Sequence, residues 1–234
     1  MELESSDRSM YLRMNDVVDG YRSELAEVAR KLTQGLDSDV AEARAIFEWV
    51  RDEIPHSHDI GIDVVTCSAS EVLRERTGIC YAKSHLFAAL TRAVGIPTGF
   101  CYQVYLAEPE TGKTAVHAFN AVYLASHRRW LRLDARGNTG EIDAQFDLER
   151  ERLAFPVDPD KGELFIYDGV FCEPAPEVVE ALRRHKRRSE LWLDLPELLA
   201  DERLCPADRE KNQTVPRRRR VAARSPQAHL LNDS

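Results

Sequence analysis

The chain has 234 residues, which is enough for one domain of ordinary size with short tails. Apolar residues make up 43% of it, enough for a buried core, and no apolar run approaches the length of a membrane span. The net charge is −8, but residues 206–234 carry +4, so the body of the chain carries −12. An acidic body argues against non-specific binding to nucleic acid.

The cysteines are odd in number, widely spaced and never arranged as C-x-x-C, which argues against a disulfide framework or a zinc knuckle. They are Cys67, Cys80, Cys101, Cys172 and Cys205. The first residues are polar, with neither the basic nor the apolar region of a signal peptide. We therefore expect a cytoplasmic protein without a membrane partner, metal or cofactor. We also expect residues 1–10 to be disordered.

Helical periodicity dominates the first part of the chain. It predicts helices over residues 16–32 and 39–54, the second of them capped by Asp37 or Ser38. Residues 55–67 are predicted to form a loop. Ser68 and Glu71 then match a capping box at the start of a short helix. A further helix is expected from Cys80 to Val94, closed by a glycine and a proline.

The period changes to two after residue 99, which is typical of strands. Strands are predicted at 100–106, 115–125 and 130–135, joined by short polar turns as an antiparallel meander. Helices followed by strands indicate an α+β fold. A strand over 163–171 and helices over 174–185 and 189–200 follow. We expect one domain over residues 11–204 and a disordered basic tail over 205–234.

Cys80 is a candidate nucleophile because it opens a predicted helix. Free N–H groups and the positive end of the helix dipole favour a thiolate there, and the same N–H groups could hold an oxyanion. A small buried core residue is the competing interpretation, and for an isolated cysteine it is the more common one.

His117 and Asp134 change that balance, since together with Cys80 they supply a nucleophile, a base and an orienting carboxylate. Taken singly, each fits a structural role at a strand. A hairpin centred between Ala125 and Ser126 would place His117 opposite Asp134. A longer turn over residues 126–129 would offset them by about four positions, too far without a bulge. The sequence does not decide between these registers.

Three segments together resemble the transglutaminase-like superfamily. They read GICYAKSHLFAALTRAVGIPTGF around the cysteine, HAFNAVYL around the histidine and RWLRLD at the aspartate. The order and spacing are also similar, and the resemblance is strongest over residues 40–135. Three residues depart from the family pattern: Phe119 stands where tryptophan is usual, Ala121 where an acid is frequent, and Ala135 where proline is common.

The resemblance implies a papain-like core in which the cysteine helix packs on an antiparallel sheet. It implies that Cys80 is the nucleophile, His117 the base and Asp134 the orienting residue. The expected activity is acyl chemistry on peptide or glutamine-type amides, as a hydrolase or an acyl/amine transferase, with a peptide or protein as substrate and no cofactor. The alternative is a catalytically inactive module that keeps the groove for binding.

Other candidate residues carry weaker signals. His56, His58 and Asp59 could suggest a metal site, but a surface loop or a groove wall near Cys80 is the preferred interpretation. Lys83 could assist the thiolate, although an exposed helix lysine is the simpler expectation. The run Arg217–Arg220 is most simply a solvated tail, with a basic docking arm as the alternative.

Overall fold

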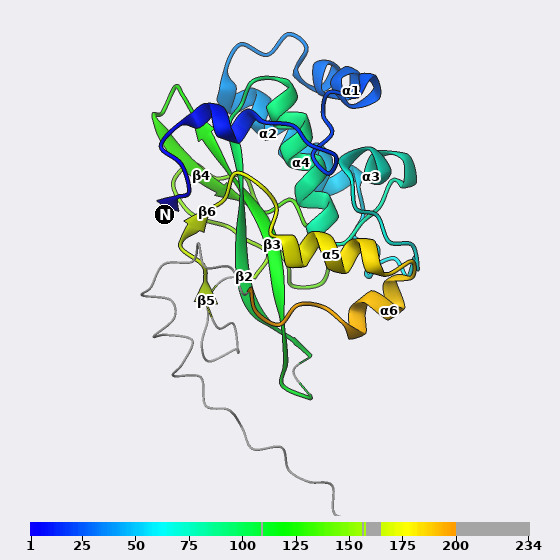
Figure 1. Cartoon of the computed structure of the whole chain (residues 1–234). Coiled ribbons are helices and arrows are strands. Elements are labelled where there is room, and N and C mark those ends of the chain that lie inside the picture. The colour runs from blue at the N-terminus through cyan, green and yellow to red at the C-terminus, as the bar shows by residue number, and fades with distance from the viewer. Residues whose placement is uncertain (109, 156, 158–164, 200–234) are drawn as a thin grey trace, which may run out of the picture.

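The computed structural model describes residues 1–108, 110–155, 157 and 165–199. Its helices lie on one side of an antiparallel sheet, so the fold is α+β as predicted (Figure 1). The predicted basic tail over 205–234 lies outside the described residues.

The N-terminal helices surround α4 (Cys80–Ala93), the central helix of the domain. The helices before it are α1 (Ser23–Thr33), α2 (Asp39–Glu53) and α3 (Ala69–Glu75). Ser38 caps α2 by accepting a hydrogen bond from the Ala41 N–H, and Ser68 forms the predicted capping box with Glu71. Helix α1 begins seven residues later than predicted, because Asn15 accepts hydrogen bonds from the N–H groups of Val17 and Val18 and holds them in a turn.

The main sheet has the order β4-β3-β2-β5. The predicted meander is present in its first three strands: β2 (Thr98–Glu108), β3 (Lys113–Leu124) and β4 (Arg129–Leu133). The short β5 (Phe165–Ile166) continues the sheet on the other side of β2, and it is followed by β6 (Gly169–Val170).

Residues 1–10 are not disordered, contrary to our expectation. β1 (Glu2–Leu3) pairs in parallel with β6, and the 3-10 helix η1 (Arg8–Leu12) follows. Tyr11 provides the physical reason, because its ring is fully buried against Trp130 and its hydroxyl donates to the Val170 carbonyl. One buried aromatic side chain therefore anchors a segment whose polar composition suggested disorder.

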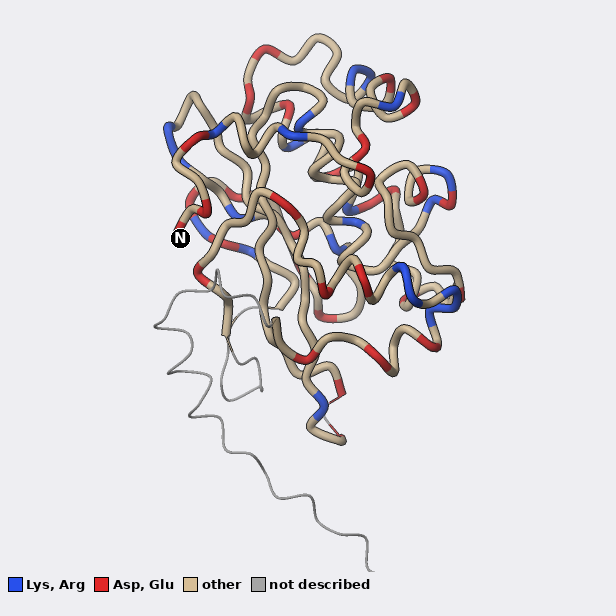
Figure 2. Tube along the Cα trace, viewed as in Figure 1, with Lys and Arg blue, Asp and Glu red and all other residues tan. Residues whose placement is uncertain are grey.

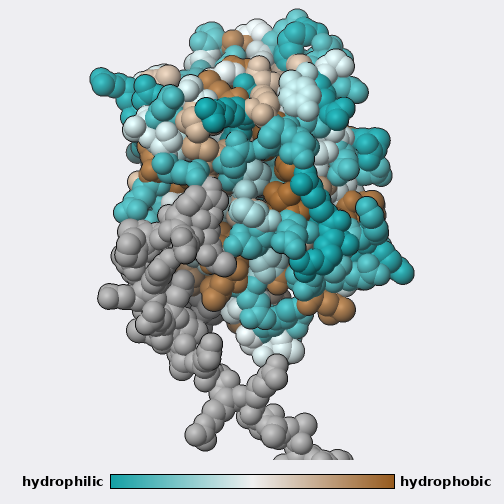
Figure 3. Space-filling view, in the orientation of Figure 1, coloured by the Kyte–Doolittle hydropathy of each residue, from teal (hydrophilic) through white to brown (hydrophobic). Residues whose placement is uncertain are grey.

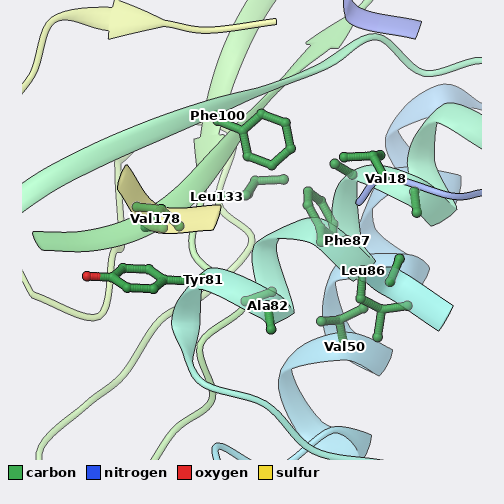
Figure 4. Packing of buried hydrophobic residues seen from close by; sticks show 14 of the residues in the cluster. Val18, Val50, Tyr81, Ala82, Leu86, Phe87, Phe100, Leu133 and Val178 are labelled. Atoms are coloured by element: carbon green, nitrogen blue, oxygen red, sulfur yellow. The ribbon is translucent and has the colours of Figure 1, made fainter. Parts of the chain in front are cut away.

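The core lies between α4 and the sheet. Figure 4 shows Phe87 of α4 inside this core. The sheet residues Phe100 and Leu133 lie on one side of it, and Val50 of α2 lies on the other. Nearly every residue of α4 is buried, so the helix is enclosed on all sides and its start is fixed relative to β3.

The chain ends, within the described part, in α5 (Pro176–Arg184) and α6 (Arg188–Leu193). Acidic and basic residues alternate over most of the surface, with a basic stretch where α5 meets α6 (Figure 2). The face seen in Figure 3 is largely hydrophilic with scattered apolar areas. Among the described residues, no helix combines the length and apolar character that crossing a bilayer requires.

Candidate active site

Cys80 is the first residue of α4, as predicted, and it is half-buried. Ile79 is the N-cap residue and no side chain caps this end, so the first N–H groups of the helix remain available to a ligand. Gly78 allows the close approach of the preceding loop: a Cβ there would lie 2.8 Å from the Thr66 hydroxyl. The local sequence thus places a sulfur where a helix end offers donors and positive potential.

The hairpin between β3 and β4 adopts a register between the two that the sequence left open. Leu124 pairs with Arg129 and Asn120 with Leu133, so the turn comprises residues 125–128. Continued by one position, this pairing places Asp134 opposite Phe119, two residues from His117 on the same face of the sheet. Such diagonal neighbours lie within reach of an imidazole and a carboxylate.

His117 and Asp134 form a buried hydrogen-bonded pair. His117 Nε2 lies 2.7 Å from Asp134 Oδ2, and each side chain is 1% exposed. The carboxylate also accepts hydrogen bonds from the backbone N–H groups of Arg136 (3.1 Å) and Ala154 (2.9 Å). Burial favours the neutral acid, but His117 and these donors outweigh it and hold the pKa of Asp134 below its ordinary value.

The imidazole of His117 lies between Asp134 and Cys80. Since Nε2 faces the carboxylate, Nδ1 is the ring nitrogen left for the sulfur, and His117 and Cys80 line the same cavity. Burial alone would lower the pKa of His117, but the charges of Asp134 and Cys80, with hydrogen bonds to both, raise it to about 9. An imidazolium beside a cysteine sulfur stabilises the thiolate form.

Aromatic rings fix the plane of the imidazole. Phe155 meets it edge-on at 4.9 Å, Phe119 lies nearly parallel at 6.0 Å, and Tyr105 approaches at 6.0 Å. Phe155 is itself stacked on Tyr105, and its carbonyl accepts a hydrogen bond from Gln103, a neighbour of His117 in the sheet. These contacts leave the ring little freedom to turn away from Cys80 and Asp134.

The cavity beside Cys80 is nearly closed. Its free volume is about 10 Å³, at the lower limit for a single water molecule. Trp192 and Leu195 contribute to its lining; they belong to residues 188–199, which we call the cover. The cover comprises α6 and the six residues that run back from it toward β3 (Figure 1). An amide substrate therefore has no room above the sulfur while the cover is in place.

Lys83, one turn after Cys80, is not the exposed helix lysine that we expected. It is 1% exposed, and its ammonium donates to the carbonyl of Ile54. Burial, reinforced by the positive charge of Arg136, lowers the pKa of Lys83 to about 7, against the opposing effect of nearby carboxylates. The error arose because α4 is surrounded by other elements, and a helix of mixed composition does not reveal this.

The loop after α2 forms a wall of the cavity, one of the two interpretations given to it. His56 is 3% exposed and lines the cavity, and burial lowers its pKa well below the ordinary value, so it is neutral. Asp59 forms a two-point ion pair with Arg136 (2.7 and 2.9 Å), and His58 stacks on Trp192 at 4.1 Å. Among the described residues, no group of three potential ligands is arranged to hold a metal ion.

Residues 26–135, just under half of the chain, match the family described as the transglutaminase-like superfamily. The matched segment contains Cys80, His117 and Asp134, and the resemblance stated from the sequence is confirmed. No curated protein matches the chain.

Solved structures resemble the chain at low identity. A candidate cysteine protease from Cytophaga hutchinsonii is 23% identical with a TM-score of 0.46, over 56% of this chain and 43% of its own. The periplasmic domain of TgpA from Pseudomonas aeruginosa is 18% identical with a TM-score of 0.41, over 55% of this chain and 46% of its own. The chain thus spans less than half the length of either structure.

Sequence reasoning missed the side chains that enclose the site. Phe155 lies in an irregular segment without periodicity, and Leu195 belongs to a C-terminal stretch for which the sequence predicted only a helix over 189–200. The one usable signal was the pattern of Leu191, Leu195 and Leu199, which are all buried beside exposed neighbours.

Proposed function

We propose that this protein is a cysteine-dependent enzyme that acts on peptide or glutamine-type amides through Cys80, His117 and Asp134. The observation that carries the proposal is the buried imidazole of His117, which lies between a carboxylate with three hydrogen-bond donors and a sulfur at a helix N-terminus. A structural histidine needs one hydrogen-bond partner. This one lies between two: a carboxylate that orients the ring and a sulfur that can act as a nucleophile.

The proposed reaction begins with attack by the Cys80 thiolate on the amide carbonyl carbon. The N–H groups at the start of α4 stabilise the resulting oxyanion. The C–N bond then breaks, the leaving amine takes the proton from His117, and a thioester remains on Cys80. His117, now neutral, accepts a proton from the incoming nucleophile, which displaces the sulfur as thiolate. Asp134 orients the ring throughout.

The acyl acceptor determines the class of enzyme. Water as acceptor gives a peptidase or amidase, and a primary amine gives an acyl transferase. Both share the first half-reaction, so the two outcomes are separated by measuring the released carboxylate against the incorporated amine.

A catalytically inactive binding module is the second candidate, and one observation favours it: the free volume of about 10 Å³ beside Cys80 admits no substrate. A binding module has no need for an activated thiol. The reactivity of the sulfur therefore discriminates the two functions.

The test is alkylation of Cys80 by iodoacetamide near pH 7, followed by peptide mass spectrometry. Cys80→Ala should remove the modification, and His117→Ala should slow it by about tenfold or more, because the imidazolium no longer stabilises the thiolate. His127→Ala is the matched control, since His127 is exposed in the turn of the same hairpin. Equal alkylation of the His117→Ala and wild-type proteins would contradict an activated thiolate.

A further inference from the structure

The edge of β3 beside His117 is bonded to the cover rather than to another strand. β4 pairs with β3 only over Asn120–Leu124, so the described strands leave the first half of this edge without a neighbour. There the Val116 N–H donates to the Pro196 carbonyl at 2.7 Å, and the Val116 carbonyl accepts from the Tyr81 hydroxyl. A strand edge without a neighbouring strand can bind an extended peptide through backbone hydrogen bonds.

The cover places one apolar side chain into the cavity and keeps its neighbours outside. Leu195, the residue before Pro196, is 7% exposed and lines the cavity with Cys80 and His117. Leu193, two residues earlier, is 77% exposed. Helix α6 ends at Leu193, and the chain beyond its C-cap Asp194 turns the side chain of Leu195 toward the active site. A backbone bonded to the strand edge with a leucine directed at the nucleophile has the geometry expected of a bound peptide.

The contacts that hold this segment are of a kind that can be exchanged. Pro196 has no N–H to donate, so it contributes a single backbone hydrogen bond to β3. Lys113 adds a bond to the Trp192 carbonyl at 3.1 Å, and Asp194 is paired with Arg184 and His185 at the surface. Exposed ion pairs contribute little to stability, so the cover is retained mainly by the packing of Leu191, Leu195 and Leu199 and by the hydrogen bond from the Leu199 N–H to the Tyr167 hydroxyl.

We propose that the edge of β3 at Val116 is the binding site for an acyl-donor peptide, and that the cover is a tethered occupant which this peptide displaces. The peptide binds in extended form, gives a backbone carbonyl to the Val116 N–H and inserts an apolar side chain where Leu195 lies. The proposal rests on the proposed function of Cys80 and adds the substrate class: a peptide with a leucine-like residue next to the position bonded to Val116.

The first experiment compares Leu195→Ala with Leu193→Ala, the same change at an exposed position of the cover. Cys80 alkylation by iodoacetamide is followed by mass spectrometry, and Cys101, which is fully buried, is monitored in the same digest. Opening of the cover raises the rate at Cys80 by about tenfold or more in Leu195→Ala alone and leaves Cys101 protected. Equal rates in the two variants, or parallel labelling of Cys80 and Cys101, would overturn the proposal.

The second experiment supplies the cover in trans. A synthetic peptide of residues 188–199 is added to the Leu195→Ala protein, and a second peptide carries aspartate at the position of Leu195. The first peptide should slow Cys80 alkylation and the second should not, because an aspartate would be desolvated in the apolar site. Protection by both peptides or by neither contradicts a site for an apolar side chain.

Failure of this proposal is distinguishable from failure of the proposed function. In the Leu195→Ala background, His117→Ala tests the activated thiolate independently of access to the cavity. A rate at Cys80 that depends on Leu195 but not on His117 would retain the peptide site and refute the catalytic role. A rate at Cys80 that depends on His117 but not on Leu195 would retain the catalytic role and refute the peptide site.

Discussion

The inner wall and the outer cover of the Cys80 cavity are held by different kinds of interaction. The wall, formed by α4 and the β3–β4 hairpin, keeps His117 and Asp134 at 1% exposure in a network of buried hydrogen bonds. The cover is held by surface ion pairs, by hydrogen bonds from the Val116 N–H and the Lys113 side chain of β3, and by the packing of a few leucines. Buried networks are rigid, whereas surface contacts exchange readily. The contrast predicts that His117 and Asp134 keep their places when the cover moves.

The largest effect is expected from Asp134→Asn, which tests how far His117, in the wall, depends on the Asp134 carboxylate. We expect a decrease in kcat of about 100- to 10,000-fold, since the amide neither orients the imidazole correctly nor stabilises its charge. Asp134 raises the pKa of His117, so its removal lowers that pKa from about 9. The imidazolium that protonates the leaving amine is then lost at a lower pH.

The measurement is the pH dependence of kcat/KM for amide turnover, in which the alkaline limb should move toward neutrality. Asp147→Asn, at a carboxylate that accepts only local backbone hydrogen bonds, is the matched control. An unchanged alkaline limb in Asp134→Asn would show that His117 does not owe its charge to this carboxylate.

Lys83→Met tests the burial of Lys83, a residue of α4 in the wall, through the pH dependence of the free energy of unfolding. Burial lowers the pKa of Lys83 to about 7, so between about pH 7 and 10 the unfolded chain binds a proton that the folded chain does not. Stability from this group therefore rises with pH, with a slope of up to about 1.4 kcal/mol per pH unit. Lys83→Met should remove that slope from the free energy of unfolding.

Urea unfolding at several pH values measures this difference, with Lys31→Met, at an exposed lysine of α1, as the control. Parallel pH profiles for the wild-type and Lys83→Met proteins would mean that the lysine is charged in both folded and unfolded states.

The smallest effect is expected from Asp63→Ala, which loosens the cover at its start. Asp63 accepts hydrogen bonds from the Ser189 N–H at 2.7 Å and from Arg187, and both of its partners lie at the beginning of α6. We expect Cys80 alkylation to accelerate by about two- to fivefold, less than with Leu195→Ala, because the leucines still pack. Glu27→Ala, an exposed ion-pair change on α1, should leave the rate unchanged. A change as large as that of Leu195→Ala would assign the closure to the ion pair instead.

The elements that the sequence predicted correctly are those that depend on local interactions. The capping residues of α2 and α3, the start of α4 and the three strands follow local rules, and each is present within a few residues of its predicted place. Cys80, His117 and Asp134 were found because their chemistry and order form a pattern. Their roles in catalysis stay predictions until the thiol is tested.

What could not be predicted depends on contacts between distant parts of the chain. The hairpin register follows from a turn whose length the sequence of residues 125–128 did not reveal. The burial of Lys83 follows from the elements packed around α4, and the order of residues 1–10 follows from the pocket that receives Tyr11. The position of the cover follows from its contacts with β3 and the core, including the hydrogen bond from the Val116 N–H to the Pro196 carbonyl and the burial of Leu191, Leu195 and Leu199.

The four-residue turn between Leu124 and Arg129 has a consequence for how this hairpin can vary. One added or lost residue would invert the facing of everything that follows, and Asp134 would point away from the imidazole. The loss of two residues, with a four-residue turn kept, would restore the facing but carry the carboxylate about 6.6 Å along the strand, away from His117. Homologous chains that retain the chemistry should therefore vary this turn in sequence while keeping its length.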